Sequence, residues 1–140
     1  MVDELKLEDE PEAGKLTIKE KWQGAVTDGS GFVAVPMSLL RLQTKYKLTA
    51  TEMLVLVNLL AHWWDPAHSV FPRTTTIAKR MGIDKRTVQR AINRVASLGL
   101  LNKERLDDGK RAYDFVPLAK RLAKDVTVSY ALQSQETLHG

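Results

Sequence analysis

The sequence contains no cysteine among its 140 residues. This absence excludes disulfide-stabilised scaffolds, thiol nucleophiles and cysteine-ligated zinc fingers. The sequence also lacks an uncharged apolar run of the ~18 residues that a membrane-spanning helix needs, so we expect no membrane contact. The first twelve residues are acidic and lack the basic-then-apolar pattern of a secretory signal. Together these absences predict a cytoplasmic protein, associated with the nucleoid if it binds DNA.

Signatures of catalysis are missing as well. The sequence has no nucleotide-binding glycine loop, no Gly-x-Ser-x-Gly motif and no convincing pair of catalytic carboxylates. His62, Asp65 and His68 are close in sequence, but Pro66 breaks the helix that would align them as metal ligands. We therefore expect neither an enzyme nor a metal site nor a cofactor.

Charge is distributed unevenly along the chain. Residues 1–30 hold eight acidic residues and four lysines, a net charge of −4, whereas residues 31–140 have a net charge of +8. Residues 73–111 alone hold eleven basic and four acidic residues. A basic segment this dense favours binding to a polyanion and makes that binding sensitive to salt. We interpret residues 1–14 as a flexible acidic tail that shields the basic face or recruits a basic partner.

The N-terminal half of the chain predicts a hairpin and two helices. Short apolar segments on both sides of a glycine-rich turn predict a β-hairpin over residues 15–35. A short helix follows Pro36, which suits the first turn of a helix. A longer helix from Ala50 to Trp64 begins at a capping box formed by Thr49 and Glu52. Because this longer helix is apolar on most sides, we expect it to be the buried core helix.

The next segment predicts two helices joined by a tight turn, followed by a hairpin. The first helix runs from residue 74 or 75 to Met81 and ends at Gly82, where glycine tolerates positive φ. The second helix, residues 84–98, is capped by Asp84 and ends at a glycine in the same way. Two strand-like segments follow, joined by Asp108-Gly109, a pair suited to a hairpin turn.

This order of elements predicts a winged helix-turn-helix, a mainly helical fold with a small β-hairpin wing. A two-stranded hairpin directly after two helices joined by a tight turn is the feature on which the prediction depends. The expected divisions are a flexible tail at 1–14, a hairpin at 15–35, a winged-helix domain at 36–116, a C-terminal helix for dimerisation at 117–130 and a polar tail at 131–140.

The helix at 84–98 separates its side chains by chemistry. Val88, Ile92 and Val95 share one face with Ala91 and Leu98, and this face can pack on the core helix. The other sides carry long hydrogen-bond donors, which suit base edges in the major groove of DNA. The same pattern also fits a helix whose charged face is merely solvated. The predicted DNA contacts are Arg73, Thr74, Thr75, Lys85, Arg86, Thr87, Gln89, Arg90, Asn93, Arg94, Lys110 and Arg111.

These contacts fall into three groups by their place on the expected elements. Residues near the start of the recognition helix are the expected base readers, namely Lys85, Arg86, Gln89 and Arg90, with Thr87 touching a phosphate or a thymine methyl. The threonine cluster at 74–76 is placed to hold a phosphate or to cap its helix. The basic pair at 110–111 on the wing is placed to meet the backbone or the minor groove, although the acidic pair at 107–108 repels phosphate.

The segment FPRTTTIAKRMGIDKRTVQRAINRVASLGLLNKER, from Phe71 to Arg105, resembles the helix-turn-helix of a winged-helix family. Members of this family occur among bacterial plasmid and phage replication initiators and related transcriptional regulators. GFVAVPMSLLRL at Gly31–Leu42 and the segment Leu48–Trp64 resemble the lead-in and first helix, so the resemblance covers residues 31–116. It implies that Thr75, Lys85, Arg86, Thr87, Gln89 and Arg90 lie at the DNA. Three threonines stand where the family pattern has serine followed by glutamine or glutamate.

The resemblance implies a sequence-specific protein that binds double-stranded DNA in transcription control, replication or partition. We expect a homodimer, because one recognition helix reads few base pairs and paired half-sites increase specificity. Its interface is expected at residues 117–130 and 15–35. The alternative is a winged helix that binds another protein through its basic surface or its terminal extensions. Trp22, Trp63 and Trp64 are candidate anchors for such a partner, or core residues.

Overall fold

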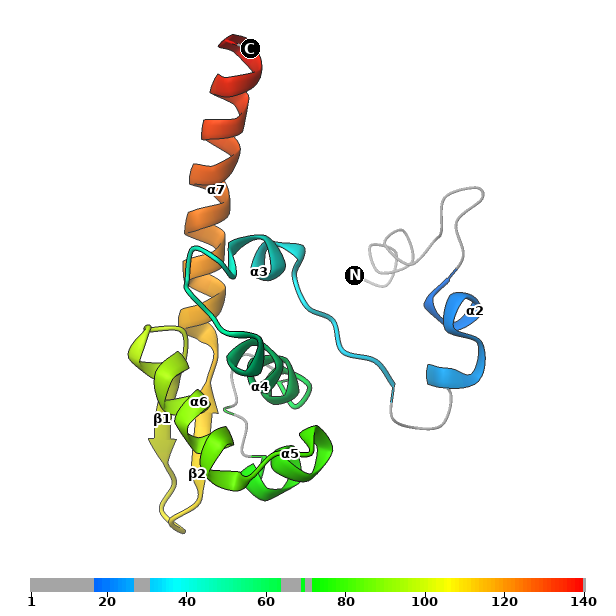
Figure 1. Cartoon of the computed structure of the whole chain (residues 1–140), viewed down its shortest axis with the longest axis vertical. Helices are drawn as coiled ribbons and strands as arrows, with labels where there is room; N and C mark the ends of the chain where they lie inside the picture. Colours follow the sequence, from blue (N-terminus) through cyan, green and yellow to red (C-terminus); the bar gives the residue numbers. More distant parts are fainter. Residues whose placement is uncertain (1–16, 27–30, 64–68, 70–71, 140) are drawn as a thin grey trace. The chain divides into compact units, whose positions relative to one another are not determined.

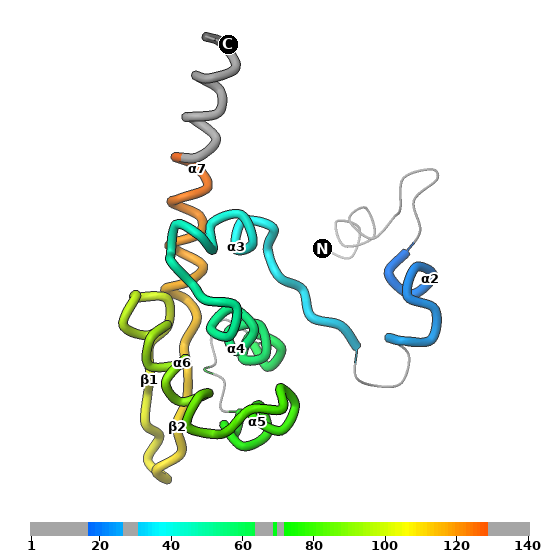
Figure 2. The backbone as a smooth tube through the Cα atoms, viewed as in Figure 1, coloured from blue at the N-terminus to red at the C-terminus, as the bar shows by residue number. Residues whose placement is uncertain are grey.

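The computed structural model describes residues 17–26, 31–63, 69 and 72–139, and the chain divides into two compact units after Phe32 (Figure 1). In the first unit, the described residues form a short α-helix, α2 (Ile18–Trp22), and a 3-10 helix, η1 (Gln23–Val26). Neither helix buries a residue. Figure 2 shows the same path as a tube.

The β-hairpin expected at 15–35 is wrong, because the structure has helix where the first strand was expected. Thr17 and Glu20 form a capping box: the Glu20 backbone N–H donates to Thr17 Oγ1 at 3.2 Å, and the Thr17 N–H donates to Glu20 Oε2 at 3.4 Å. These two bonds satisfy amide donors that a helix start otherwise leaves without partners. The expected turn at 27–30 lies outside the described residues.

The second unit has the element order of a winged helix-turn-helix, which confirms the predicted fold class. A two-stranded antiparallel hairpin follows four helices, and a long helix follows the hairpin (Figure 1). The elements are α3 (Met37–Leu42), α4 (Ala50–Leu60), α5 (Thr74–Met81), α6 (Lys85–Ser97), β1 (Asn102–Arg105), β2 (Arg111–Asp114) and α7 (Val116–His139).

The hydrophobic core forms where α6 packs against α4 and α5. The predicted capping box of α4 is present, since Glu52 N–H donates to Thr49 Oγ1 and Thr49 N–H donates to Glu52 Oε1. From α4, Val55, Leu56 and Leu59 are almost completely buried. The predicted inner face of α6 is buried as well, at Val88, Ala91, Ile92 and Val95. Each such aliphatic side chain contributes about 1.5–3 kcal/mol by leaving water, and this burial sets how α6 is oriented on the core.

Helix α4 ends at Leu60, four residues before the predicted end at Trp64. The backbone then tightens, because the N–H groups of His62 and Trp63 donate three residues back, to Leu59 and Leu60 carbonyls. The Trp63 ring packs on Phe115, with ring centroids 5.9 Å apart. Trp63 is therefore a partly buried core residue rather than an anchor for a partner. Trp64 and the helix stop expected at Asp65-Pro66 lie outside the described residues.

The turn between α5 and α6 is built as the sequence predicts. Gly82 has φ +68°, and the N–H of Ile83 donates to the Ala78 carbonyl five residues back. This arrangement closes the helix end with a residue in the left-handed region, which glycine adopts without strain. Asp84 then caps α6 by accepting from the Thr87 N–H at 3.3 Å.

The wing is a hairpin of two four-residue strands, and the residues that flank it lie in the core. Leu100 and Leu101 before β1 and Phe115 after β2 are buried. The strands pair so that Lys103 faces Tyr113 and Arg105 faces Arg111. The connecting loop contains Gly109 at φ +84°, and the Leu106 N–H donates to the Lys110 carbonyl across it. The predicted Asp-Gly turn is thus part of a three-residue loop whose last residue is left-handed.

Helix α7 continues to His139. The C-terminal helix expected at 117–130 is therefore too short, and the polar tail expected at 131–140 is wrong as far as His139. No proline or glycine occurs between Leu118 and His139 to end the helix. Its first half packs against α3 and the core through Leu118 and Leu122. In the part of the chain that the structure describes, no helix is long and apolar enough to cross a membrane.

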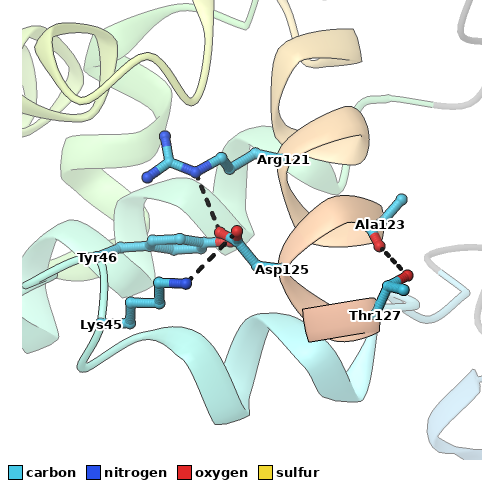
Figure 3. A network of polar contacts seen from close by, with 6 residues as sticks. All are labelled: Lys45, Tyr46, Arg121, Ala123, Asp125 and Thr127. Atoms are coloured by element: carbon cyan, nitrogen blue, oxygen red, sulfur yellow. Dashed lines mark hydrogen bonds and ion pairs between the residues drawn. The ribbon is translucent and has the colours of Figure 1, made fainter. Parts of the chain in front are cut away.

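A buried carboxylate fixes α7 to the turn after α3 (Figure 3). Asp125, only 6% exposed, accepts from the Tyr46 hydroxyl at 2.8 Å and from Arg121 Nε at 3.1 Å. Lys45 Nζ lies 3.5 Å from the other carboxylate oxygen. The hydrogen bond from Tyr46 and the two cations hold the pKa of Asp125 below its ordinary value, and burial raises the pKa of Tyr46.

Candidate nucleic-acid interface

Helix α6 presents its donors on the sides away from the core. Arg86 and Arg90 are exposed and spaced one helical turn apart, opposite the buried row of Val88, Ile92 and Val95. Lys85 is also exposed, and Gln89 is half-buried. The long donors predicted for base contacts are therefore displayed together along the first two turns, which are the turns that meet base edges in helix-turn-helix proteins.

The start of α6 is held by the contact between Asp84 and Thr87. The Thr87 hydroxyl donates to Asp84 Oδ1, in addition to the bond from its N–H. These hydrogen bonds hold the pKa of Asp84 below its ordinary value, and Arg90 contributes to the shift. The carboxylate therefore stays ionised at neutral pH. Thr87 uses its proton for the cap, which leaves only its hydroxyl oxygen and methyl group to meet DNA.

Three elements converge on one recess of about 500 Å³. The wall from α6 contains Lys85 and Gln89, and the hairpin contributes Lys110, Arg111 and Tyr113. The third wall is the start of α5, at 72–75. The recess thus brings together seven predicted DNA contacts: Arg73, Thr74, Thr75, Lys85, Gln89, Lys110 and Arg111.

The α5 wall of the recess is a helix N-terminus with free amides. Arg73 occupies the N-cap position, and its side chain makes no capping hydrogen bond. The first turn contains no acidic residue. Unpaired N–H groups and the helix dipole favour an anion at such an end. Thr75 is exposed and Thr74 half-buried beside these amides, so this part of the predicted site is suited to a phosphate.

A second recess, of about 330 Å³, lies between α6 and the hairpin. It is lined by Asn93, Lys103, Glu104, Arg105 and two residues shared with the first recess, Arg111 and Tyr113, so it holds one acidic residue. Because both are lined by Arg111 and Tyr113, the two recesses are neighbours, and together they are called the groove beside α6. Lys103, Arg105 and Tyr113 were not among the predicted contacts. Their signal in the sequence was the alternation of basic residues at positions 103 and 105, which places both on one side of a strand.

Two predicted contacts are bonded within the fold or half-buried. Asn93 Oδ1 accepts a hydrogen bond from Lys103 Nζ at 2.7 Å, which joins α6 to β1. Arg94 is half-buried, and among the described residues its buried Nη1 has no hydrogen-bond partner. These two side chains are less free to meet DNA than Arg86 and Arg90.

The tip of the wing carries charges of both signs. Asp108 accepts from the Lys110 N–H at 3.0 Å, and its carboxylate lies 3.7 Å from Lys110 Nζ. Asp107 is exposed beside it. The Lys110 charge is thus partly compensated within the loop, whereas Arg111 carries no ion pair among the described residues.

The candidate metal ligands do not come together in the described part of the chain. Asp65 and His68 lie outside the described residues, and elsewhere in the described ranges no group of three or more histidine or acidic residues is clustered. His62 is half-buried at the end of α4, where burial and the nearby Arg80 charge lower its pKa.

Comparison with known protein families agrees with this geometry. Residues 46–101 match the family model described as a helix-turn-helix domain. Among curated proteins, none matches the chain. The matched segment begins just before α4 and ends just before β1, so it contains all of α4, α5 and α6. Helix-turn-helix domains are DNA-binding modules. Residues 46–101 therefore form a helix-turn-helix domain, and with the hairpin that follows them the fold is a winged helix-turn-helix.

Proposed function

We propose that this protein binds double-stranded DNA in a sequence-specific way, with α6 in the major groove. The observation that carries the proposal is the recess in which α6, the start of α5 and the wing meet. All three walls carry cations or free amide donors, and none carries an acidic residue. The wall residues of α6 are also adjacent to the exposed pair Arg86 and Arg90.

In this proposal each element makes a different kind of contact. Arg86 and Arg90 read guanine edges, and Gln89 reads an adenine, because these side chains match the donor and acceptor patterns of those bases. The start of α5 and Arg111 bind phosphates and set the register of the helix on the duplex. The phosphate contacts make the affinity fall with salt.

The double variant Arg86→Ala/Arg90→Ala tests the proposal. We expect at least about a tenfold loss of affinity for duplex DNA, since each good base contact contributes about 1–3 kcal/mol. The matched control is Arg41→Ala/Lys120→Ala, which removes the same charge from α3 and α7, away from the tip of the wing (Figure 1). Both variants should unfold at the temperature of the unaltered chain. Equal DNA affinity of the two variants would contradict the proposal.

The proposal extends to a homodimer formed through α7. Support comes from the continuation of α7 to His139 and from apolar side chains that remain exposed near its contact with α3, at Met37, Leu40 and Val128. Two copies would read paired half-sites. Light scattering of the full chain, with and without duplex DNA, should give twice the mass of one chain. A single-chain mass under both conditions would rule out the dimer.

The biological role proposed is that of a non-enzymatic transcriptional regulator or a replication or partition factor, acting in the cytoplasm at the nucleoid. Selecting bound fragments from genomic DNA separates these roles. An iterated array beside a replication gene indicates initiation or partition, and a single palindrome at a promoter indicates repression.

The second candidate function is protein binding through α2. Trp22 is 58% exposed and Ile18 is 47% exposed, one helical turn apart, and tryptophan is enriched in the anchor positions of interfaces. The variant Trp22→Ala should leave duplex affinity unchanged under the DNA-binding proposal. If instead the Arg86/Arg90 variant binds duplex normally and Trp22→Ala loses a protein partner, the second candidate is favoured.

A further inference from the structure

The hairpin has one side that faces α6 and one that does not. Directly paired residues point to the same side of a sheet, so Lys103 and Tyr113 lie on one side of the hairpin. Arg105 and Arg111 are also paired and lie two residues further along each strand, so alternation places them on that same side. Lys103 Nζ donates to Asn93 of α6, which identifies this as the α6-facing side. Glu104 alternates to the other side of its strand, where its carboxylate accepts from Ser69 Oγ at 2.7 Å, although Glu104 also lines the second recess.

Tyr113 lies at the centre of this side with its ring almost completely buried. The residue is 2% exposed and lines both recesses, and burial raises the pKa of its hydroxyl. Among the described residues no hydrogen bond joins that hydroxyl to a partner. Buried hydroxyls in folded proteins almost always have a hydrogen-bond partner. Among the described residues, the fully buried polar side-chain atoms without a partner belong to His62, Trp63 and Arg94; the Tyr113 hydroxyl is not one of them, so a ligand in the recess can reach it.

The charge around Tyr113 identifies the chemistry of this ligand. Lys103, Arg105 and Arg111 stand on the same side, and the tyrosine hydroxyl is neutral at physiological pH and donates one proton. Three cations around a neutral donor suit a singly charged phosphodiester oxygen better than a cation or an apolar group.

We infer that Tyr113 is a DNA-binding residue, whose hydroxyl donates to a backbone phosphate of the strand that passes between α6 and the wing. Arg105 and Arg111 supply the charge at that phosphate, and Asn93 is a positioning residue that holds the hairpin against α6 through Lys103. The inference rests on the proposed function and extends it, because it assigns backbone contacts to the side of the wing rather than to its tip.

The variant Tyr113→Phe tests this assignment with a random-sequence duplex as the probe. We expect a loss of affinity of about ten- to a hundredfold, the range for one hydrogen bond to a charged group. The slope of log affinity against log salt should not change, because no charge is removed. Thermal stability should not fall, since the hydroxyl has no partner in the free protein.

Two companion variants complete the design. Tyr46→Phe removes a hydroxyl that is bonded to Asp125 at α7, and it should lower stability without changing DNA affinity. Arg105→Gln should weaken binding and reduce the salt slope by about 1.

Three results overturn the inference. If the unaltered chain binds no duplex, the proposed function fails and the inference fails with it. If the chain binds duplex and both Tyr113→Phe and Arg105→Gln bind equally well, only the inference fails. If Tyr113→Phe weakens binding of inorganic phosphate but not of duplex, the recess is a site for free anions, and its assignment to the DNA backbone is wrong.

Discussion

Side chains along the groove beside α6 differ in how free they are to meet a ligand. Arg86 and Arg90 have no ion pair among the described residues, whereas Thr87 is bonded to Asp84 and Asn93 is bonded to Lys103. A side chain that is already bonded must break that bond, or share it, to reach a base. The free arginines are therefore the strongest candidates for direct readout, and the bonded residues set the geometry around them.

The acidic pair at the wing tip should weaken nonspecific DNA binding. Asp108 lies 3.7 Å from Lys110 Nζ and partly compensates its charge, and Asp107 is exposed next to it. We predict that Asp107→Asn/Asp108→Asn raises affinity for random-sequence duplex several-fold at low salt, because two charges that repel phosphate are removed. A titration over a range of salt concentrations measures this. Unchanged affinity at the lowest salt would show that the tip lies away from the duplex.

Most of the residues that line the recess of about 500 Å³ were predicted from the sequence. The helical period separated the buried row of α6 from its donors, and both the buried row and the exposed arginines lie where the period placed them. Tyr113 was not predicted as a contact because an aromatic residue in a strand usually belongs to the core, and its ring does belong to the core cluster. Its pairing with Lys103 depends on the register of the hairpin, which strand alternation alone does not determine.

At the scale of the elements, the turn between α5 and α6 determines how the recognition helix is presented. We predict that Gly82→Ala lowers the free energy of unfolding by about 1 kcal/mol, since a left-handed residue with a Cβ is strained. The backbone is in that region at φ +68°, and no heavy atom within 4 Å would obstruct the new methyl group. Denaturant unfolding measures the change.

The variant Gly82→Asn is the matched comparison. Asparagine visits the left-handed region more easily than alanine, so it should cost less. If asparagine and alanine are equally destabilising, strain at this φ is not the cause.

The anchor of α7 should make stability depend on pH. The native pKa of Asp125 lies below its ordinary value of 3.8, so its ionised form stabilises the fold above about pH 4. This contribution is lost as pH falls through the native pKa. We predict that Asp125→Asn costs about 1–3 kcal/mol at pH 7, and that the difference from the unaltered chain shrinks at pH 3.

Denaturant unfolding of both proteins at the two pH values measures this difference. A difference that stays constant with pH would mean that the ionised carboxylate is not what holds α7.

Sequence reasoning was wrong at α2 and at the end of α7, where the local pattern alone did not determine the structure. At α2, the alternation of the residues fits a strand, whereas the Thr17–Glu20 capping box fits a helix. The structure has the helix. At α7, the polar composition after Tyr130 indicated a tail, but a helix that starts on packed residues continues until a breaker stops it. By contrast, α5 ends at Gly82 and α6 begins at the Asp84 cap, and the limits of both helices were predicted closely.

In the molecule as a whole, packed core residues hold the walls of the basic groove. Leu100, Leu101 and Phe115 root the wing in the core, and the Asn93–Lys103 bond ties it to α6. The groove walls are therefore held in place before any ligand arrives, which reduces the cost of ordering them on binding. The net charge of residues 73–111 supplies the attraction, and the acidic residues before Ser30 oppose it.

We expect duplex DNA to occupy the groove formed by α6, the start of α5 and the wing. Amide NMR spectra of the full chain, recorded during titration with duplex DNA, test it most directly because they report on every element at once. We predict the largest shifts at residues 73–76, 85–94 and 103–113, with little change along α7. Shifts concentrated on α7 or α2, with the groove residues unmoved, would contradict it.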